Sequence, residues 1–126
     1  MSAGDPRPAV WIGHALLPSR DVAAARAWYE KLGMRFITAG ETFAVLELRG
    51  GTHLVLLRAE APLEAGAAAP FDLMVEDIEA SHRRFRELGL EPTELEKGPI
   101  HTSFRLRDPS GYAVTVNSSH VSDQPV

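Results

Sequence analysis

Residues 21–33 read DVAAARAWYEKLG, and residues 77–89 read DIEASHRRFRELG. Each stretch opens on Asp, carries apolar or small residues at helical spacing, and closes on Gly. Asp suits the N-cap of a helix because its carboxylate accepts backbone N–H bonds, and Gly suits the position after the last turn. The two stretches are in register at an offset of 56 residues (77 − 21). They therefore predict a tandem repeat of one helix-containing module.

The segments around each predicted helix follow the same order in both halves. One β-prone segment precedes each helix and three follow it, with Gly-containing turns between them. The expected strands cover residues 10–17, 34–38, 42–48 and 52–57, then 70–75, 91–94, 102–107 and 112–117. The sequence thus predicts a single α+β domain, residues 1–126, built from two βαβββ modules in tandem. The modules span about residues 9–58 and 70–118, with a linker at 59–69 and a flexible tail at 119–126.

Composition excludes several classes of protein. The chain has 126 residues, is 44% hydrophobic and carries a net charge of −4, so it can fill a core but offers no basic surface for nucleic acid or anionic membrane. It contains no Cys, which removes disulfides, thiolate metal sites and a Cys nucleophile. No apolar run is long enough to cross a membrane, and no export signal is visible at the start. We expect a cytoplasmic protein.

Residues 106–117, LRDPSGYAVTVN, predict a tight turn and the strand that follows it. Asp accepts local backbone N–H bonds, Pro fixes φ, and Gly permits positive φ, so residues 108–111 have turn chemistry. Alternation along the next strand places Ala113, Thr115 and Asn117 on one face. That face is small and polar, and it carries no acid.

The paired modules, the segment GHALLPSRDVAAARAWYEKLGM (13–34) and the turn RDPSGYAVTV (107–116) resemble the vicinal oxygen chelate superfamily. That group contains glyoxalase I, extradiol dioxygenases, fosfomycin-resistance proteins and bleomycin-resistance proteins. The resemblance covers nearly the whole chain. It implies two modules whose curved mixed sheets surround a cavity, usually completed by a homodimer.

The resemblance also implies four metal-ligand positions, which hold His14, Val55, Pro70 and Thr115 in this chain. Superfamily enzymes use His and Glu side chains there to hold a divalent metal with one position open for substrate. Pro and Val have no donor atom, and a neutral Thr hydroxyl is a poor substitute for a carboxylate. We therefore expect no metal and no other cofactor, which is the character of the metal-free bleomycin-resistance branch.

Strand alternation predicts the side chains that line the cavity. The lining combines apolar walls with a few polar groups that can orient a ligand, as in many small-molecule pockets. A buried Arg105 would need a carboxylate partner, Glu47 or Asp72, or an anionic ligand. The expected ligand-binding residues are His14, Phe43, Glu47, His53, Val55, Asp72, His101, Ser103, Arg105 and Thr115, with Leu57 and Met74 beside them.

The leading functional hypothesis is metal-free binding or sequestration of a small organic molecule by a homodimer, with antibiotic resistance as one possible purpose. A second hypothesis is a metal-dependent lyase, transferase or dioxygenase with non-standard ligands drawn from His14, His53, Glu47 and His101. A third is a metal-free acid–base isomerase or cyclase that uses a cavity His with Asp72 or Glu47. Neither nucleic acid nor a membrane is an expected partner. The sequence names no catalytic residue and no particular ligand.

Overall fold

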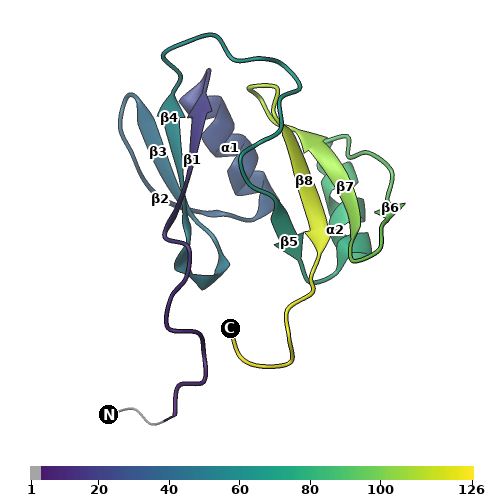
Figure 1. The fold of residues 1–126 in the computed structure, drawn as a ribbon. Coiled ribbons are helices and arrows are strands. Elements are labelled where there is room, and N and C mark those ends of the chain that lie inside the picture. Colours follow the sequence, from purple (N-terminus) through teal and green to yellow (C-terminus); the bar gives the residue numbers. More distant parts are fainter. Residues whose placement is uncertain (1–3) are drawn as a thin grey trace.

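The computed structural model describes residues 4–126 (Figure 1). The first half runs β1 (His14–Ser19), α1 (Val22–Leu32), β2 (Arg35–Ala39), β3 (Phe43–Glu47), the short 3-10 turn η1 (Arg49–Gly51) and β4 (His53–Arg58). The second half runs β5 (Leu73–Val75), α2 (Ile78–Glu87), β6 (Glu96–Lys97), β7 (Thr102–Arg107) and β8 (Ala113–Ser118). Both halves therefore have the predicted βαβββ order.

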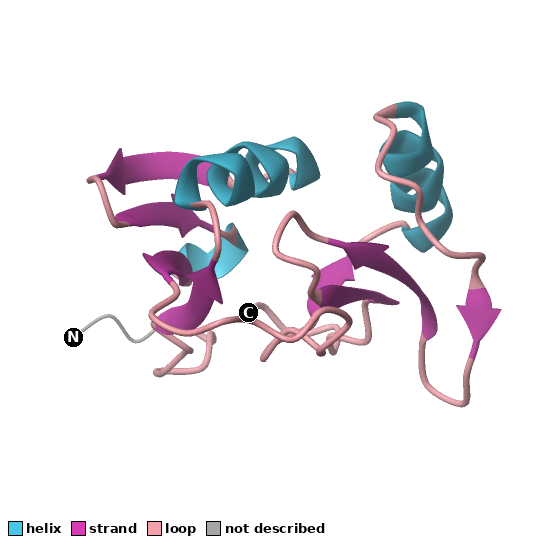
Figure 2. Cartoon of the chain, turned by 90° about the horizontal axis from the view of Figure 1, so that it is seen from above, coloured by secondary structure: helices cyan, strands magenta, loops and turns pink. Residues whose placement is uncertain are grey.

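Each module forms its own four-stranded mixed sheet. The strand orders are β1-β4-β3-β2 and β5-β8-β7-β6, so corresponding strands occupy corresponding places in the two sheets. The first and last strands of each module pair in parallel, and the remaining pairs are antiparallel. Figure 2 shows the two modules side by side, each with its helix against one face of its sheet. The α+β prediction is confirmed, and neither sheet closes into a barrel.

The helices begin at the two predicted Asp residues. The Asp21 carboxylate accepts the backbone N–H of Ala24 at 3.0 Å, and the Asp77 carboxylate accepts that of Ala80 at 3.0 Å. Each bond satisfies an amide that has no partner inside the helix. The first helix ends at Gly33 with a φ of 116°, a left-handed conformation that Gly adopts without steric cost.

Three strands differ from the predicted ranges by more than one residue at an end. Strand β1 begins at His14, because residues 10–12 lie outside the sheet and are exposed. The segment before β5 pairs with β8 through residues 67–69 instead of forming the start of β5. Strand β6 lies at Glu96–Lys97 and not at 91–94, where the proline at 92 has no N–H to donate to a strand partner.

The turn between β7 and β8 joins the two modules. The Tyr29 hydroxyl of α1 donates a hydrogen bond to the Asp108 carboxylate at 2.8 Å, and both side chains are buried. The Tyr112 hydroxyl donates to the backbone carbonyl of Pro18 at 2.8 Å. Tyr112 also belongs to the first module's hydrophobic core, while Trp28 of α1 packs against both cores. The modules therefore contact each other through α1 and through Pro18 near the end of β1.

Residues 59–69, predicted as a linker, take part in this contact. The Gly66 N–H donates to the Gly111 carbonyl at 2.8 Å, and the Ala69 N–H donates to the Ala113 carbonyl at 2.9 Å. Leu63 packs against the first module's core. Within residues 4–126, no helix has the length and apolar character needed to cross a membrane.

Candidate functional site

Each sheet has one face covered by its helix and one open face. On the first sheet the covered face carries Leu17, Ala44, Leu46, Leu54 and Leu56, all at most 1% exposed. Alternation sends the intervening side chains to the open face. Six of the predicted cavity residues lie there: His14 on β1, Phe43 and Glu47 on β3, and His53, Val55 and Leu57 on β4.

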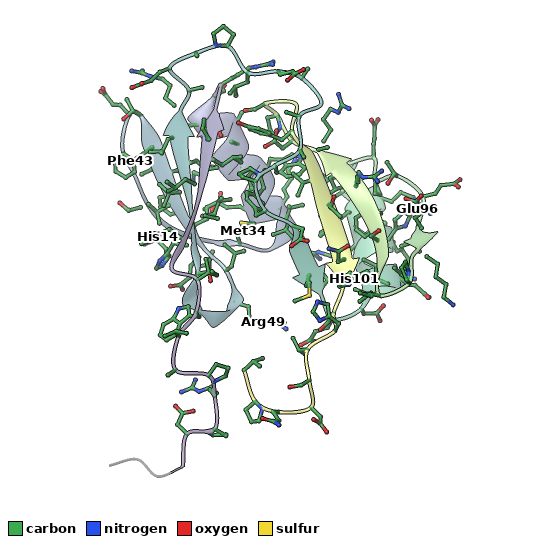
Figure 3. All side chains as sticks on the ribbon, in the orientation of Figure 1. His14, Met34, Phe43, Arg49, Glu96 and His101 are labelled. Atoms are coloured by element: carbon green, nitrogen blue, oxygen red, sulfur yellow. The ribbon has the colours of Figure 1, made fainter. Side chains whose placement is uncertain are left out.

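Ionisable side chains form one row across the open face of the first sheet. Strand register pairs His14 with His53, His53 with Glu47, and Glu47 with Arg35. The ionic row therefore takes one residue from each of the four strands, at the end of the sheet near η1. Figure 3 shows His14 at this end of β1, with Phe43 at the opposite end of β3.

The next two rows on the same face are almost entirely apolar. One contains Leu16, Val55 and Val45, and the other contains Pro18, Leu57 and Phe43. Leu16 is 56% exposed, Leu57 38% and Phe43 36%, although all three are large apolar side chains. We call these six residues the apolar rows. Contiguous exposed apolar surface of this kind marks a binding face more often than an ordinary solvent surface.

Glu47 is the centre of the ionic row. His53 Nε2 lies 3.0 Å from Glu47 Oε2, and Arg35 Nε donates to Glu47 Oε1 at 3.1 Å. Hydrogen bonds from Arg35 and then His53 hold the pKa of the Glu47 carboxyl below its ordinary value, because they stabilise the charged form. The His14 and His53 rings lie beside each other, with centroids 6.1 Å apart.

The open face of the second sheet is smaller and more polar. It carries Ser103 and Arg105 from β7, Thr115 from β8 and Met74 from β5. Asp72, just before β5, accepts a hydrogen bond from the Asn117 amide at 3.1 Å. Arg105 and Thr115 are direct cross-strand partners.

Two of the predicted residues in this module have other surroundings than expected. Arg105 is exposed, and its guanidinium approaches Glu96 at 4.0 Å, so its neighbouring carboxylate is neither Glu47 nor Asp72. His101 lies in the loop before β7, where its Nδ1 is 2.9 Å from the carbonyl of Ser118. Its ring also approaches His120, with centroids 4.7 Å apart.

Two open hollows lie on the surface of the first module. One, of about 580 Å³, adjoins the ionic row and η1 and is lined by Arg7, Gly33, Arg35, Glu47, Leu48, Arg49, Gly50 and Gly51. The other, of about 670 Å³, lies under the segment that follows β4 and includes Leu57. Neither hollow combines residues from both open faces, so these hollows are not the predicted cavity between the two sheets.

The superfamily's metal does not fit the donors that the structure brings together. Thr115 and Val55 occupy two of the four implied positions, and Pro70 lies outside β5. Among residues 4–126, no group of three or more His, Asp or Glu side chains is arranged to hold a metal ion. The non-standard set is also not assembled in one chain, because Glu47 is bonded to Arg35 and His101 belongs to the other module.

Arg35 and Arg49 are the site residues that sequence reasoning missed. Arg35 enters the ionic row only through the antiparallel register of β2 and β3, which contains a bulge between Phe36 and Thr38. The charge of Arg49 next to a Gly-Gly pair was visible in the sequence, but its position beside the row depends on η1. Arg49 bonds Glu76 of the second module at 2.7 Å.

Comparisons with known proteins agree with this architecture. The family model described as Glyoxalase/Bleomycin resistance protein/Dioxygenase superfamily matches residues 11–116. Lactoylglutathione lyase from Agrobacterium tumefaciens is 21% identical, with a TM-score of 0.73 over 90% of this chain and 96% of that chain. TnmS3, an antibiotic binding protein from Streptomyces sp. CB03234, is 21% identical, with a TM-score of 0.74 over 90% of this chain and 100% of that chain. No curated protein matches the sequence.

Proposed function

Because this chain belongs to the Glyoxalase/Bleomycin resistance protein/Dioxygenase superfamily, we propose that it binds a small organic molecule without a metal. One observation carries this proposal. The open face of the first sheet keeps an exposed apolar surface, while the positions expected to hold a metal carry Thr115, Val55 and Pro70. A binding face with no complete set of metal donors suits capture of a ligand better than metal-assisted chemistry.

The likeness to TnmS3 suggests the kind of ligand to test. That protein is described as antibiotic binding, and at 21% identity the likeness itself establishes only the fold. Antibiotics with an apolar or aromatic body suit the apolar rows of this chain, which would contact such a body over Leu16, Val55 and Phe43. We therefore propose sequestration of an antibiotic-like natural product.

A homodimer forms part of the proposal. The open faces leave large apolar side chains half exposed in a single chain, and their burial favours association with another surface. A second copy that laid its open face near the apolar rows would enclose a ligand between two sheets. The small polar side chains of the second sheet, among them Ser103 and Thr115, would leave room for that ligand.

The test combines metal analysis with a ligand screen. Protein purified without chelator is expected to contain substoichiometric Zn, Ni, Mn and Fe. A panel of natural-product antibiotics is then screened by thermal shift with EDTA present, and at least one compound is expected to raise Tm, since a ligand that binds the folded state stabilises it. Phe43→Ala is expected to reduce the shift, and Ile100→Ala, at an exposed position outside the open faces, serves as the matched control. A stoichiometric metal that disappears in His14→Ala would overturn the metal-free proposal.

The contact between His53 and Glu47 favours a second candidate function, metal-free acid–base catalysis. If His53 Nε2–H donates to Glu47 Oε2, then Nδ1 of the same ring keeps its lone pair and is available as a base. The ¹⁵N shifts of the His53 ring are expected to report the Nε2–H tautomer. A ring protonated on Nδ1 alone would leave no base in this orientation and would remove the candidate.

A further inference from the structure

We propose that the ligand of this site is an amphipathic anion, with its charged group at the Arg35 and Arg49 end of the first sheet and its apolar body on the apolar rows. This inference rests on the proposed binding function and specifies the class of ligand. It follows from the order of the rows on the open face, from the pairing of Glu47, and from the charge of the adjoining hollow.

Polarity changes along the strands in one direction only. The ionic row lies at one end of the open face, and the two apolar rows follow it. Successive rows on one face are two residues apart, or roughly 7 Å. A ligand that lies along the strands would therefore place one polar end at the ionic row and a body of one or two rings on the apolar rows. A ligand that is polar at both ends would leave one polar group without a partner against Phe43 and Leu57.

The Glu47 carboxylate is occupied by its neighbours. Arg35 bonds Oε1, and His53 is in hydrogen-bond contact with Oε2. A cationic ligand group would have to displace one of these partners before it could pair with Glu47. The Glu47 carboxylate is thus the less accessible partner of this pair, since its side chain is 21% exposed and that of Arg35 is 75% exposed, so an incoming anion reaches Arg35 more readily than a cation reaches Glu47.

The hollow beside the row is lined by guanidinium groups although the whole chain carries −4. Three Arg side chains and one carboxylate line it: Arg7, Arg35, Arg49 and Glu47. Gly50 and Gly51, which also line the hollow, add no side chain of their own. An anionic group would therefore meet guanidinium groups without a bulky barrier, and guanidinium binds carboxylate, phosphate and sulfonate oxygens well.

Each of these three Arg side chains already has a carboxylate partner: Asp5 for Arg7, Glu47 for Arg35 and Glu76 for Arg49. Arg49 pairs with Glu76 at 2.7 Å, but the two side chains are 81% and 76% exposed, and the pair of Arg7 with Asp5 is exposed as well. Exposed ion pairs contribute little and exchange readily with solvent, so a bound anion competes with Glu76 on favourable terms. Figure 3 shows Arg49 reaching toward the second module from the end of the first sheet.

Two fluorescent probes with a common aromatic body test the inference. 8-Anilinonaphthalene-1-sulfonate carries a sulfonate, and N-phenyl-1-naphthylamine has nearly the same body without a charge. Their dissociation constants are measured by fluorescence titration on the folded protein at low salt. The sulfonate probe is expected to bind about tenfold more tightly than the neutral probe. Added salt is expected to weaken the binding of the sulfonate probe only.

Variants separate charge from folding. Arg35→Gln and Arg49→Gln are each expected to raise the dissociation constant of the sulfonate probe about threefold, which is the size of an exposed charge contact. Neither variant is expected to change the dissociation constant of the neutral probe. Glu47→Gln is expected to tighten the binding of the sulfonate probe, because the substitution removes a nearby negative charge. Opposite effects at Arg35 and Glu47 cannot come from a general loss of structure. Arg83→Gln, on the exposed side of α2, is the matched charge control and is expected to change neither probe.

Apolar variants show whether both probes occupy the proposed face. Leu57→Ser is expected to weaken the binding of both probes. Ile100→Ser, at an exposed position elsewhere, is expected to leave the binding of both probes unchanged. Equal binding of the two probes, with no effect of Arg35→Gln, overturns the anion inference and leaves the binding function standing. Failure of both probes to bind, or equal loss in Leu57→Ser and Ile100→Ser, overturns the inference and the proposed site together.

Discussion

The Tyr29 hydroxyl donates a hydrogen bond to the Asp108 carboxylate across the boundary between the two modules, over 2.8 Å. Asp108 also accepts the backbone N–H groups of Ser110 and Tyr112, at 2.8 and 3.0 Å. A carboxylate that is only 4% exposed is thereby satisfied by one tyrosine of the first module and two amides of its own turn. Burial, followed by the charge of Asp108, raises the pKa of the Tyr29 hydroxyl.

Tyr29→Phe tests this contact directly. The substitution removes one donor from a buried carboxylate, and we expect the free energy of unfolding to fall by about 1–3 kcal/mol. Urea denaturation followed by far-UV circular dichroism measures the change. Tyr112→Phe is the matched control, because it removes a hydroxyl that donates to the neutral carbonyl of Pro18, and its expected cost is about 1 kcal/mol or less. Equal costs for the two variants would contradict a special role for Asp108.

The bonds to Glu47 predict a pH-dependent contribution to stability. Its folded-state pKa lies below the ordinary 4.5, so the contribution is fully present above that pH and is lost as the pH falls through the folded value. Glu47→Gln is therefore expected to be less stable than the wild type at about pH 7, and the difference is expected to shrink toward about pH 3. Urea midpoints for both proteins across this range measure it. A difference that stays constant with pH would mean that the carboxylate charge is not responsible.

The proposed dimer predicts a specific effect of charge on the open face. Leu16 is a large apolar side chain that is 56% exposed on this face, and Leu16→Arg would place a charge there. We expect light scattering after size exclusion to show a dimer for the wild type and a shift toward monomer for this variant. Leu88→Arg is the matched control, since Leu88 is 39% exposed at the end of α2, away from both open faces. A stable dimer interface buries roughly 800 Å² per partner, so one central charge should disturb it. Loss of the dimer in both variants, or in neither, would contradict the proposed interface.

The repeat, the helix caps and the facing of strand residues were all predictable from local patterns. Asp21 and Asp77 cap their helices whatever the helices pack against. Alternation along β3 and β4 also places Phe43 and Val55 on one face of the sheet and Leu46 and Leu54 on the other, without reference to a partner strand. These features depend on neighbours within a few residues. They confirm that the sequence specifies each module locally.

Features that depend on distant partners were not predictable in the same way. The start of β5 is set by pairing of residues 67–69 with β8, and the ionic row is set by the register of four strands. A β-bulge after Phe36 shifts the register of β2 against β3, and no pattern in the sequence predicts that bulge. The ligand-binding role of the predicted cavity residues stays a prediction until a ligand is bound.

The connection between β3 and β4 and the connection between β7 and β8 are two copies of one turn. In the first, Gly51 N–H donates to the carbonyl of Leu48 and has a φ of 94°; in the second, Gly111 N–H donates to the carbonyl of Asp108 and has a φ of 93°. The second copy is buried against α1 and holds the modules together, while the first is partly exposed and lies beside Arg35 and Arg49. The first copy is anchored as well, because Leu48 packs against the first core and the Thr52 hydroxyl donates to the carbonyl of Ile12, so only Arg49 and Gly50 at its tip are fully exposed. The repeat thus uses one turn conformation twice, once to hold the two modules together and once to place Arg49 beside the ionic row.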